Sequence, residues 1–86
     1  MHRFIKNYID GLTINDIKVF ACSNGAILSD NELSLIYKYV KNDWQTIIFG
    51  NPNKIFNDLK ENLTSKNYQI MINLFNIYKD KFKNYL

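Results

Sequence analysis

Two helix-start signals on either side of one glycine constrain this chain more than any other feature. Thr13 precedes Asp16 by three residues, and Ser29 precedes Glu32 by the same spacing. At this spacing the hydroxyl accepts a hydrogen bond from an amide of the first helical turn, and the carboxylate lies near the positive end of the helix. Gly25 lies between the two signals and tolerates the positive φ at which many helices end. The sequence therefore predicts two helices joined by a short connector.

Apolar residues recur at helical spacing on both sides of this pair. A first helix is predicted to end near Gly11 in a left-handed cap. Asn51 and Pro52 are typical of an N-cap followed by a first-turn proline, which predicts a short helix after them. A last, longest helix is predicted to start after a cap at Thr64 or Ser65.

Residues 45–52 allow two interpretations. Their centre is β-branched and aromatic, which on its own is typical of a strand. A single strand without a partner leaves its backbone groups unsatisfied, and no second strand is predicted. We therefore expect this segment either to continue the third helix or to form an apolar loop packed on the core.

The last helix carries an unbroken apolar seam, which also has two interpretations. It is either the face by which this helix packs on the others, or the interface of a homodimer. Aromatic residues dominate the seam, whereas coiled-coil interfaces favour Leu, Ile and Val, and this favours the core. The residues predicted to form the interface in the second case are Tyr68, Met71, Tyr78, Phe82 and Tyr85.

Length and composition set the fold class. A chain of 86 residues forms one domain at most, and a domain this small needs a core dense in large side chains. Apolar residues make up 47% of the sequence and aromatic residues 15%. We therefore predict one all-α domain spanning residues 1–86. It has four to five helices, with the glycine-linked pair packed on the long C-terminal helix.

Little in the sequence points to catalysis. Cys22 is the only cysteine and His2 the only histidine, so neither an internal disulfide nor a Cys/His zinc cluster is expected. The carboxylates are scattered, and Asp16 and Glu32 are explained by capping. The three glycines are isolated and form no phosphate-binding loop. We expect no enzyme activity, no cofactor and no metal. Without a signal-peptide or membrane-spanning pattern, a cytoplasmic protein is expected.

Two kinds of partner remain. The first hypothesis is a non-enzymatic module that binds another protein, or a second copy, through an apolar helix surface. The alternative is weak nucleic-acid binding by a helix-turn-helix or helix-linker-helix, since residues 17–40 follow a helix, glycine turn, helix pattern with Ala21 and Gly25 four residues apart. Asp30 and Glu32 at the start of the would-be recognition helix oppose phosphate binding. The nucleic-acid contacts predicted by this alternative are Lys38, Lys41, Lys54 and Lys60.

The signals follow one another along the chain as Phe4-Ile5, Leu12-Thr13-Ile14-Asn15-Asp16, Phe20-Ala21, Ile27-Leu28-Ser29 with Glu32 and Ile36, Phe56-Asn57-Asp58 or Ile48-Phe49-Gly50, and Asn73-Leu74-Phe75. This order resembles the DUF2624 family, small Firmicutes proteins of unknown function. The connector Ala26-Ile27-Leu28 lacks the proline that the family often has there. The resemblance implies a bacterial cytoplasmic protein of helical fold, and it supplies no activity or binding residues.

Overall fold

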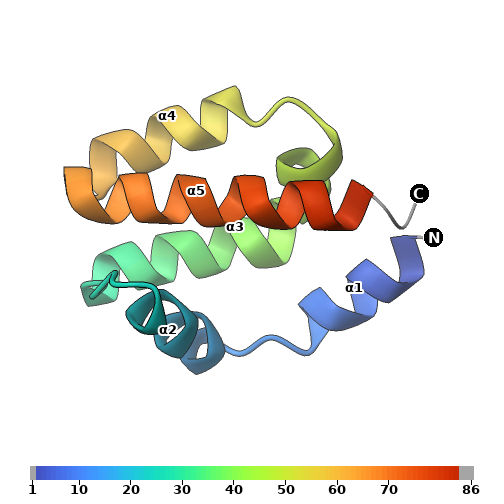
Figure 1. Cartoon of the computed structure of the whole chain (residues 1–86), viewed down its shortest axis with the longest axis horizontal. Helices are drawn as coiled ribbons and strands as arrows, with labels where there is room; N and C mark the ends of the chain where they lie inside the picture. The colour runs from blue at the N-terminus through green and yellow to red at the C-terminus, as the bar shows by residue number, and fades with distance from the viewer. Residues whose placement is uncertain (1, 84–86) are drawn as a thin grey trace.

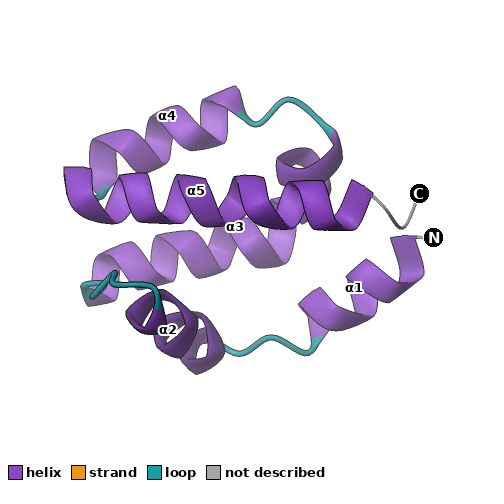
Figure 2. Cartoon of the chain, in the orientation of Figure 1, coloured by secondary structure: helices purple, strands orange, loops and turns teal. Residues whose placement is uncertain are grey.

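The computed structural model describes residues 2–83, the first and last of these by their backbone alone. Within that range the chain forms five helices and no strand (Figures 1 and 2), so the predicted all-α class is confirmed. The helices are α1 (His2–Asp10), α2 (Ile14–Ser23), α3 (Asp30–Phe49), α4 (Asn53–Asn62) and α5 (Ser65–Lys83).

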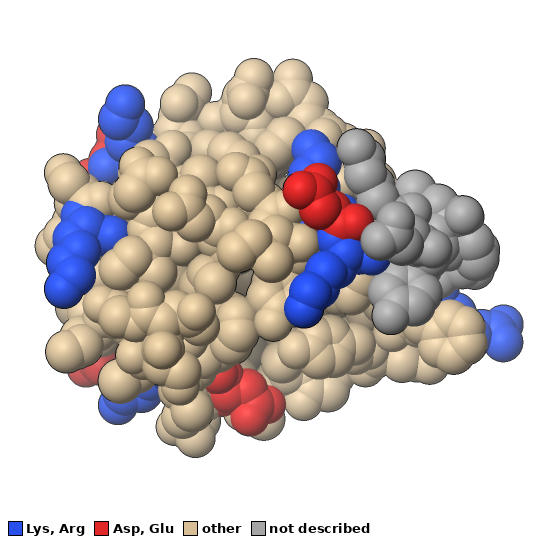
Figure 3. Space-filling view, in the orientation of Figure 1, with Lys and Arg blue, Asp and Glu red and all other residues tan. Residues whose placement is uncertain are grey.

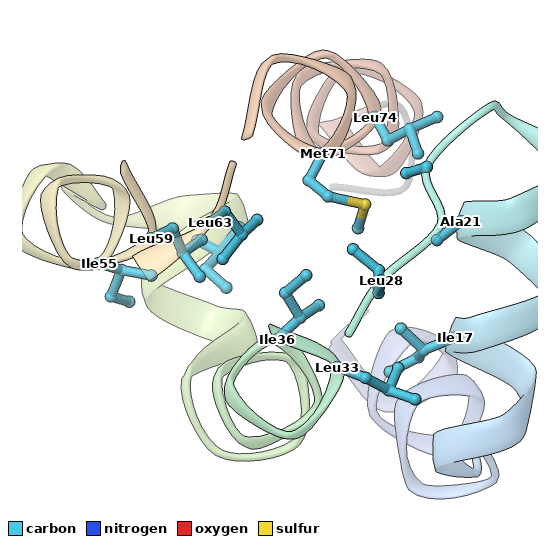
Figure 4. Packing of buried hydrophobic residues seen from close by; sticks show 12 residues of the cluster. Ile17, Ala21, Leu28, Leu33, Ile36, Ile55, Leu59, Leu63, Met71 and Leu74 are labelled. Carbon is cyan, nitrogen blue, oxygen red and sulfur yellow. The ribbon is translucent and has the colours of Figure 1, made fainter. Parts of the chain in front are cut away.

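Helix α3 lies at the centre of the fold and contacts each of the other four helices. Helix α5 runs along α3, with α4 on one side and α2 and α1 on the other (Figure 1). The larger of two core clusters draws buried side chains from α2, α3, α4 and α5 and from the connector before α3. Figure 4 shows Leu28, Ile36 and Met71 pointing toward one another at its centre.

Both predicted capping boxes are present. Thr13 Oγ1 accepts a hydrogen bond from Asp16 N at 3.1 Å, and Asp16 Oδ2 accepts one from Thr13 N at 2.9 Å. Ser29 Oγ accepts from Glu32 N at 3.2 Å, and Glu32 Oε1 accepts from Ser29 N at 2.9 Å. The start of each helix of the pair is therefore fixed by local chemistry.

The turn after α2 confirms the role predicted for Gly25, whose φ is +93°. Its N–H donates to the Cys22 carbonyl at 3.0 Å, and the next amide, of Ala26, donates to the Ala21 carbonyl at 2.8 Å. This pair of bonds is a Schellman motif, which satisfies carbonyls at the helix end. Ala21 and Ala26 are fully buried, so the motif also closes the core.

The left-handed cap predicted at Gly11 is wrong, because Gly25 is the only residue in the described part of the chain with a positive φ. The backbone carbonyls at the end of α1 accept hydrogen bonds from a side chain distant in the sequence instead. Lys41 Nζ donates to the carbonyls of Ile9, Asp10 and Leu12 at 2.9 to 3.1 Å. A cation is favourable at the negative end of a helix, and here it also joins α1 to α3.

Residues 45–49 continue α3, so the first of the two interpretations of that segment is correct up to Phe49. The backbone leaves helical geometry at one residue, Asp43, where φ is −125° and ψ is 21°. Beyond this kink Trp44 and Ile48 are buried against Ile5 and Ile9 of α1, in the second core cluster. The two isoleucines of this segment are accommodated in the helix because both are buried, Ile48 in this cluster and Ile47 in the larger one.

Helix α4 starts later than the sequence predicts. Its N-cap is Pro52, which has no side chain able to cap, so the prediction of Asn51 as N-cap is wrong by one residue. Asn51 Oδ1 accepts from Asn53 N at 3.1 Å, within the turn that precedes the helix. At α5 the cap is Thr64, whose Oγ1 accepts from Asn67 N at 3.2 Å.

Candidate functional site

An apolar cavity of about 790 Å³ lies between α1, α2, α3 and α5. It is hollowed into the face seen in Figure 3, between α5 and α2, where most of the surrounding side chains are uncharged. Its volume falls within the range of roughly 300–1,000 Å³ typical of ligand pockets. Helix α4 contributes nothing to its lining.

The floor of the cavity is one face of α3. The α3 side chains of the lining are Ile36, Val40, Trp44, Ile47 and Ile48. The first three are four residues apart, and Ile47 and Ile48 follow Trp44 by three and four residues, so together they form one broad side of the helix. Trp44 is the only tryptophan in the chain and is buried, as expected of a core residue. Tryptophan fluorescence of the protein therefore comes from one side chain of the cavity lining.

The rim of the cavity is a chain of four aromatic rings that crosses three helices. Phe20 of α2 contacts Tyr78 of α5 at a centroid distance of 5.4 Å. Tyr78 contacts Phe82 at 6.0 Å, and Phe82 contacts Tyr8 of α1 at 6.4 Å. Two of these contacts are edge-to-face, the arrangement that the ring quadrupole favours. We call Tyr8, Phe20, Tyr78 and Phe82 the aromatic rim.

Part of the apolar surface beside the cavity faces solvent. Tyr8 is 51% exposed and Val19 is 55% exposed, although both side chains line the cavity. Phe4 lies one helical turn before Tyr8 on α1 and is 75% exposed. The apolar surface therefore extends outward from the cavity onto α1 and α2.

The cavity lining contains one charged side chain, that of Asp16, and no lysine or arginine. Asp16 Oδ2 accepts the capping bond from Thr13 N, and Oδ1 has no hydrogen-bond partner in residues 2–83. The remaining polar groups of the lining are uncharged and include Asn7 and Ser23. Asp16 therefore provides the only formal charge among the lining residues.

This arrangement suits the binding of apolar surface. Among the described residues, no three His, Cys, Asp or Glu side chains are grouped as metal ligands would be. Cys22 is exposed and does not line the cavity. Nor does any helix within the described range have the length and apolar character to cross a membrane.

The structure separates the residues predicted for an interface. Tyr78 and Phe82 belong to the aromatic rim. Met71 is 2% exposed and belongs to the larger core cluster, and its side chain also forms part of the cavity lining. Tyr68 is half-buried against the same core cluster and does not line the cavity. Tyr85 lies outside the described residues.

The four lysines predicted for nucleic-acid contact do not line the cavity. Lys41 is engaged with the carbonyls at the end of α1. Lys38 Nζ lies 5.6 Å from the centroid of the Tyr39 ring. Lys54 and Lys60 are exposed in the first and last turns of α4.

The sequence analysis missed the α1 and α2 parts of the rim. The apolar stripe of α1 is wider than one buried face needs, since Ile5 and Ile9 are buried while Phe4 and Tyr8 face solvent. That width is the signal by which the exposed half of the stripe is recognisable in the sequence. The cavity itself leaves no local signal, because its lining comes from four helices.

Comparison with protein-family models, with curated proteins and with solved structures gave no match to this chain. The likeness to the DUF2624 family therefore stays a prediction, and the function is argued from the geometry of the cavity.

Proposed function

We propose that this protein is a non-enzymatic binding module, and that the cavity with its aromatic rim receives an apolar helix of a partner protein. The observation that carries the proposal is that an apolar cavity is continuous with exposed apolar side chains at its mouth. Amphipathic helices commonly bind other proteins in this way, with large side chains entering an apolar groove.

The exposed side chains at the mouth favour a protein over a small molecule. A small molecule confined to the cavity leaves the outer faces of Tyr8 and Val19 in water. A helix lying across the mouth covers them and also inserts side chains toward Trp44. Contiguous exposed apolar surface is typical of interaction sites on small soluble domains.

The polar groups of the cavity give less support to an enzyme. General acid–base or nucleophilic chemistry needs two or more reactive groups within hydrogen-bond reach of one another. The lining offers one carboxylate, which also caps α2, and no cysteine or histidine. Nucleic-acid binding lacks comparable support, since Lys41 is committed to the end of α1.

The test compares protein capture by two matched surface variants. Val19→Lys places a charge at the mouth of the cavity, whereas Ile27→Lys replaces a side chain that is 81% exposed and outside the lining. Both positions are exposed, so neither substitution is expected to change stability by more than about 0.5 kcal/mol. We expect wild type and Ile27→Lys to capture the same protein from cells of the source organism, and Val19→Lys to lose it.

A helical fragment of the captured protein that contains no tryptophan is then titrated against the purified module. A shift in Trp44 emission places the fragment at the cavity. Equal capture by all three proteins, or saturable binding with no change in Trp44 emission, contradicts the proposal. Sedimentation of the module alone shows whether a second copy occupies the site instead.

A further inference from the structure

We infer that the partner helix carries a basic side chain beside its apolar anchors and that this side chain pairs with Asp16. This inference rests on the proposed function and adds the chemistry of the partner. It predicts selection by charge at a site whose binding surface is otherwise apolar.

Asp16 is placed to make this selection. It is the only charged residue of the lining, and it lies one helical turn before Phe20 of the aromatic rim. Its Oδ1 has no hydrogen-bond partner in residues 2–83, and Lys6–Asp10 is the only ion pair within that range. The carboxylate therefore keeps an acceptor oxygen at the cavity lining, and no lysine or arginine of residues 2–83 forms an ion pair with it.

The surrounding cations do not remove that charge. Lys18 is two residues further along α2, and residues two apart on a helix do not face each other. Lys81 Nζ lies 5.3 Å from the centroid of the Tyr78 ring, on α5, and is not part of the lining. A basic side chain on the partner is consequently favoured on the α2 side of the cavity and disfavoured on the α5 side.

The positive net charge of the protein alone favours an acidic peptide, so binding a basic peptide more tightly indicates a local cause. At +3 the whole molecule attracts an acidic peptide over long distances. A preference for a basic peptide therefore has to arise locally. An exposed ion pair contributes little energy, so the expected discrimination is modest and depends on salt.

The experiment uses two synthetic amphipathic helices that share one Leu/Phe face and contain no tryptophan. In one peptide lysine flanks the apolar face on one side only, and in the other glutamate takes the same places; the opposite flank is uncharged in both. Titration followed by Trp44 fluorescence is expected to show the lysine peptide binding about three- to tenfold more tightly at low salt. The ratio combines the attraction of lysine to Asp16 in one peptide with the repulsion of glutamate by Asp16 in the other. High salt is expected to reduce this ratio toward one.

Two variants with the same change in net charge show whether the preference for the lysine peptide depends on Asp16. Asp16→Asn keeps an oxygen that accepts the bond from Thr13 N, and it is expected to abolish the preference. Asp30→Asn also removes a carboxylate from the first turn of a helix, but outside the lining, and is expected to preserve the preference. Thermal unfolding of both variants confirms that they fold.

The outcomes separate the inference from the proposed function. Equal binding of the two peptides, or a preference that survives in Asp16→Asn, overturns the role of Asp16 and leaves the cavity as a binding site. If neither peptide binds or changes Trp44 emission, both proposals are overturned.

Discussion

Asn67 Nδ2 lies 3.1 Å from Glu32 Oε1 and 3.0 Å from the carbonyl oxygen of Ile27, so one amide group joins α5 to the connector and to α3. The Glu32 carboxylate also accepts from two backbone amides, that of Ser29 at 2.9 Å and that of Thr64 at 3.0 Å. These amides lie at the starts of α3 and α5. A single buried carboxylate therefore holds the positive ends of two helices together.

This network predicts a loss of stability in acid. Burial alone raises the pKa of Glu32, but the bonds from the Ser29 and Thr64 amides, the Asn67 side chain and the Ser29 hydroxyl outweigh it, and the net pKa is lowered from 4.5. A folded-state pKa below the unfolded value adds stability above that unfolded value. The contribution is lost as the pH falls through the lower, folded-state pKa. Urea unfolding measured from pH 7 down to pH 3 is expected to show this decline.

Glu32→Gln is the control for that decline. Glutamine places an NH₂ group against backbone donors, so we expect it to lower the free energy of unfolding by about 1–3 kcal/mol at pH 7. It also removes the titrating group, and the acid slope is expected to become shallower. Asp16→Asn, in the matching but exposed box of α2, is expected to cost about 1 kcal/mol or less. An unchanged acid slope in Glu32→Gln would assign the decline to other carboxylates.

A second titration is predicted at the junction of α3 and α4, where the Tyr39 hydroxyl donates to Asp58. This bond, with burial and the negative charges of Asp58 and Asp43, raises the pKa of Tyr39 from 10.0 to about 12. Its stabilising effect is therefore full below pH 10 and is lost as the pH rises through about 12. The ultraviolet absorbance of tyrosinate in wild type minus Tyr39→Phe is expected to show this one transition. Asp58→Asn is expected to move it to lower pH, and a difference curve centred near 10 would contradict the assignment.

Replacing Gly25 and Gly11 by alanine tests how much the positive φ of Gly25 contributes to the need for glycine there. A Cβ at Gly25 meets only Ile70 Cδ1 at 3.8 Å, so the cost of Gly25→Ala comes from the positive φ and not from a clash. We expect it to destabilise the fold by about 1–2 kcal/mol. Gly11 has no positive φ and its nearest atoms are 3.6 Å away, so Gly11→Ala is expected to be neutral or slightly stabilising. Equal thermal midpoints for the two variants would remove the special role of Gly25.

The features that sequence analysis recovered are those encoded within a few residues. Thr13 with Asp16 and Ser29 with Glu32 are each three residues apart, and Gly25 directly follows the helix it ends. The features it missed join distant segments. Lys41 reaches carbonyls 29 to 32 residues away, and Asn67 reaches Glu32 across 35 residues. Such contacts depend on how helices cross, which periodicity alone does not specify.

The candidate site could be predicted from the sequence only in part, because it also joins distant segments. Tyr78 and Phe82 stand out on the last helix because their seam is long and regular. Tyr8 and Phe20 become rim residues only when α1 and α2 are placed beside α5, on the side away from α4. The sequence thus predicts the apolar faces, whereas the cavity results from the angles at which those faces meet.

The cavity also predicts how the stability of the protein responds to larger side chains. Val40 lies on its floor, so Val40→Phe adds volume where space is available. Leu59 is fully buried in the larger core cluster and does not line the cavity, and Leu59→Phe adds volume where none is available. Overpacking a filled core costs about 1–3 kcal/mol, so Leu59→Phe is expected to lower stability by that amount while Val40→Phe leaves it unchanged or raises it. Chemical denaturation measures both, and Val40→Phe is also expected to weaken the binding of any helix that inserts side chains toward Trp44. If Val40→Phe destabilises the protein as strongly as Leu59→Phe, the space beside Val40 is already filled in solution and the binding site must lie elsewhere.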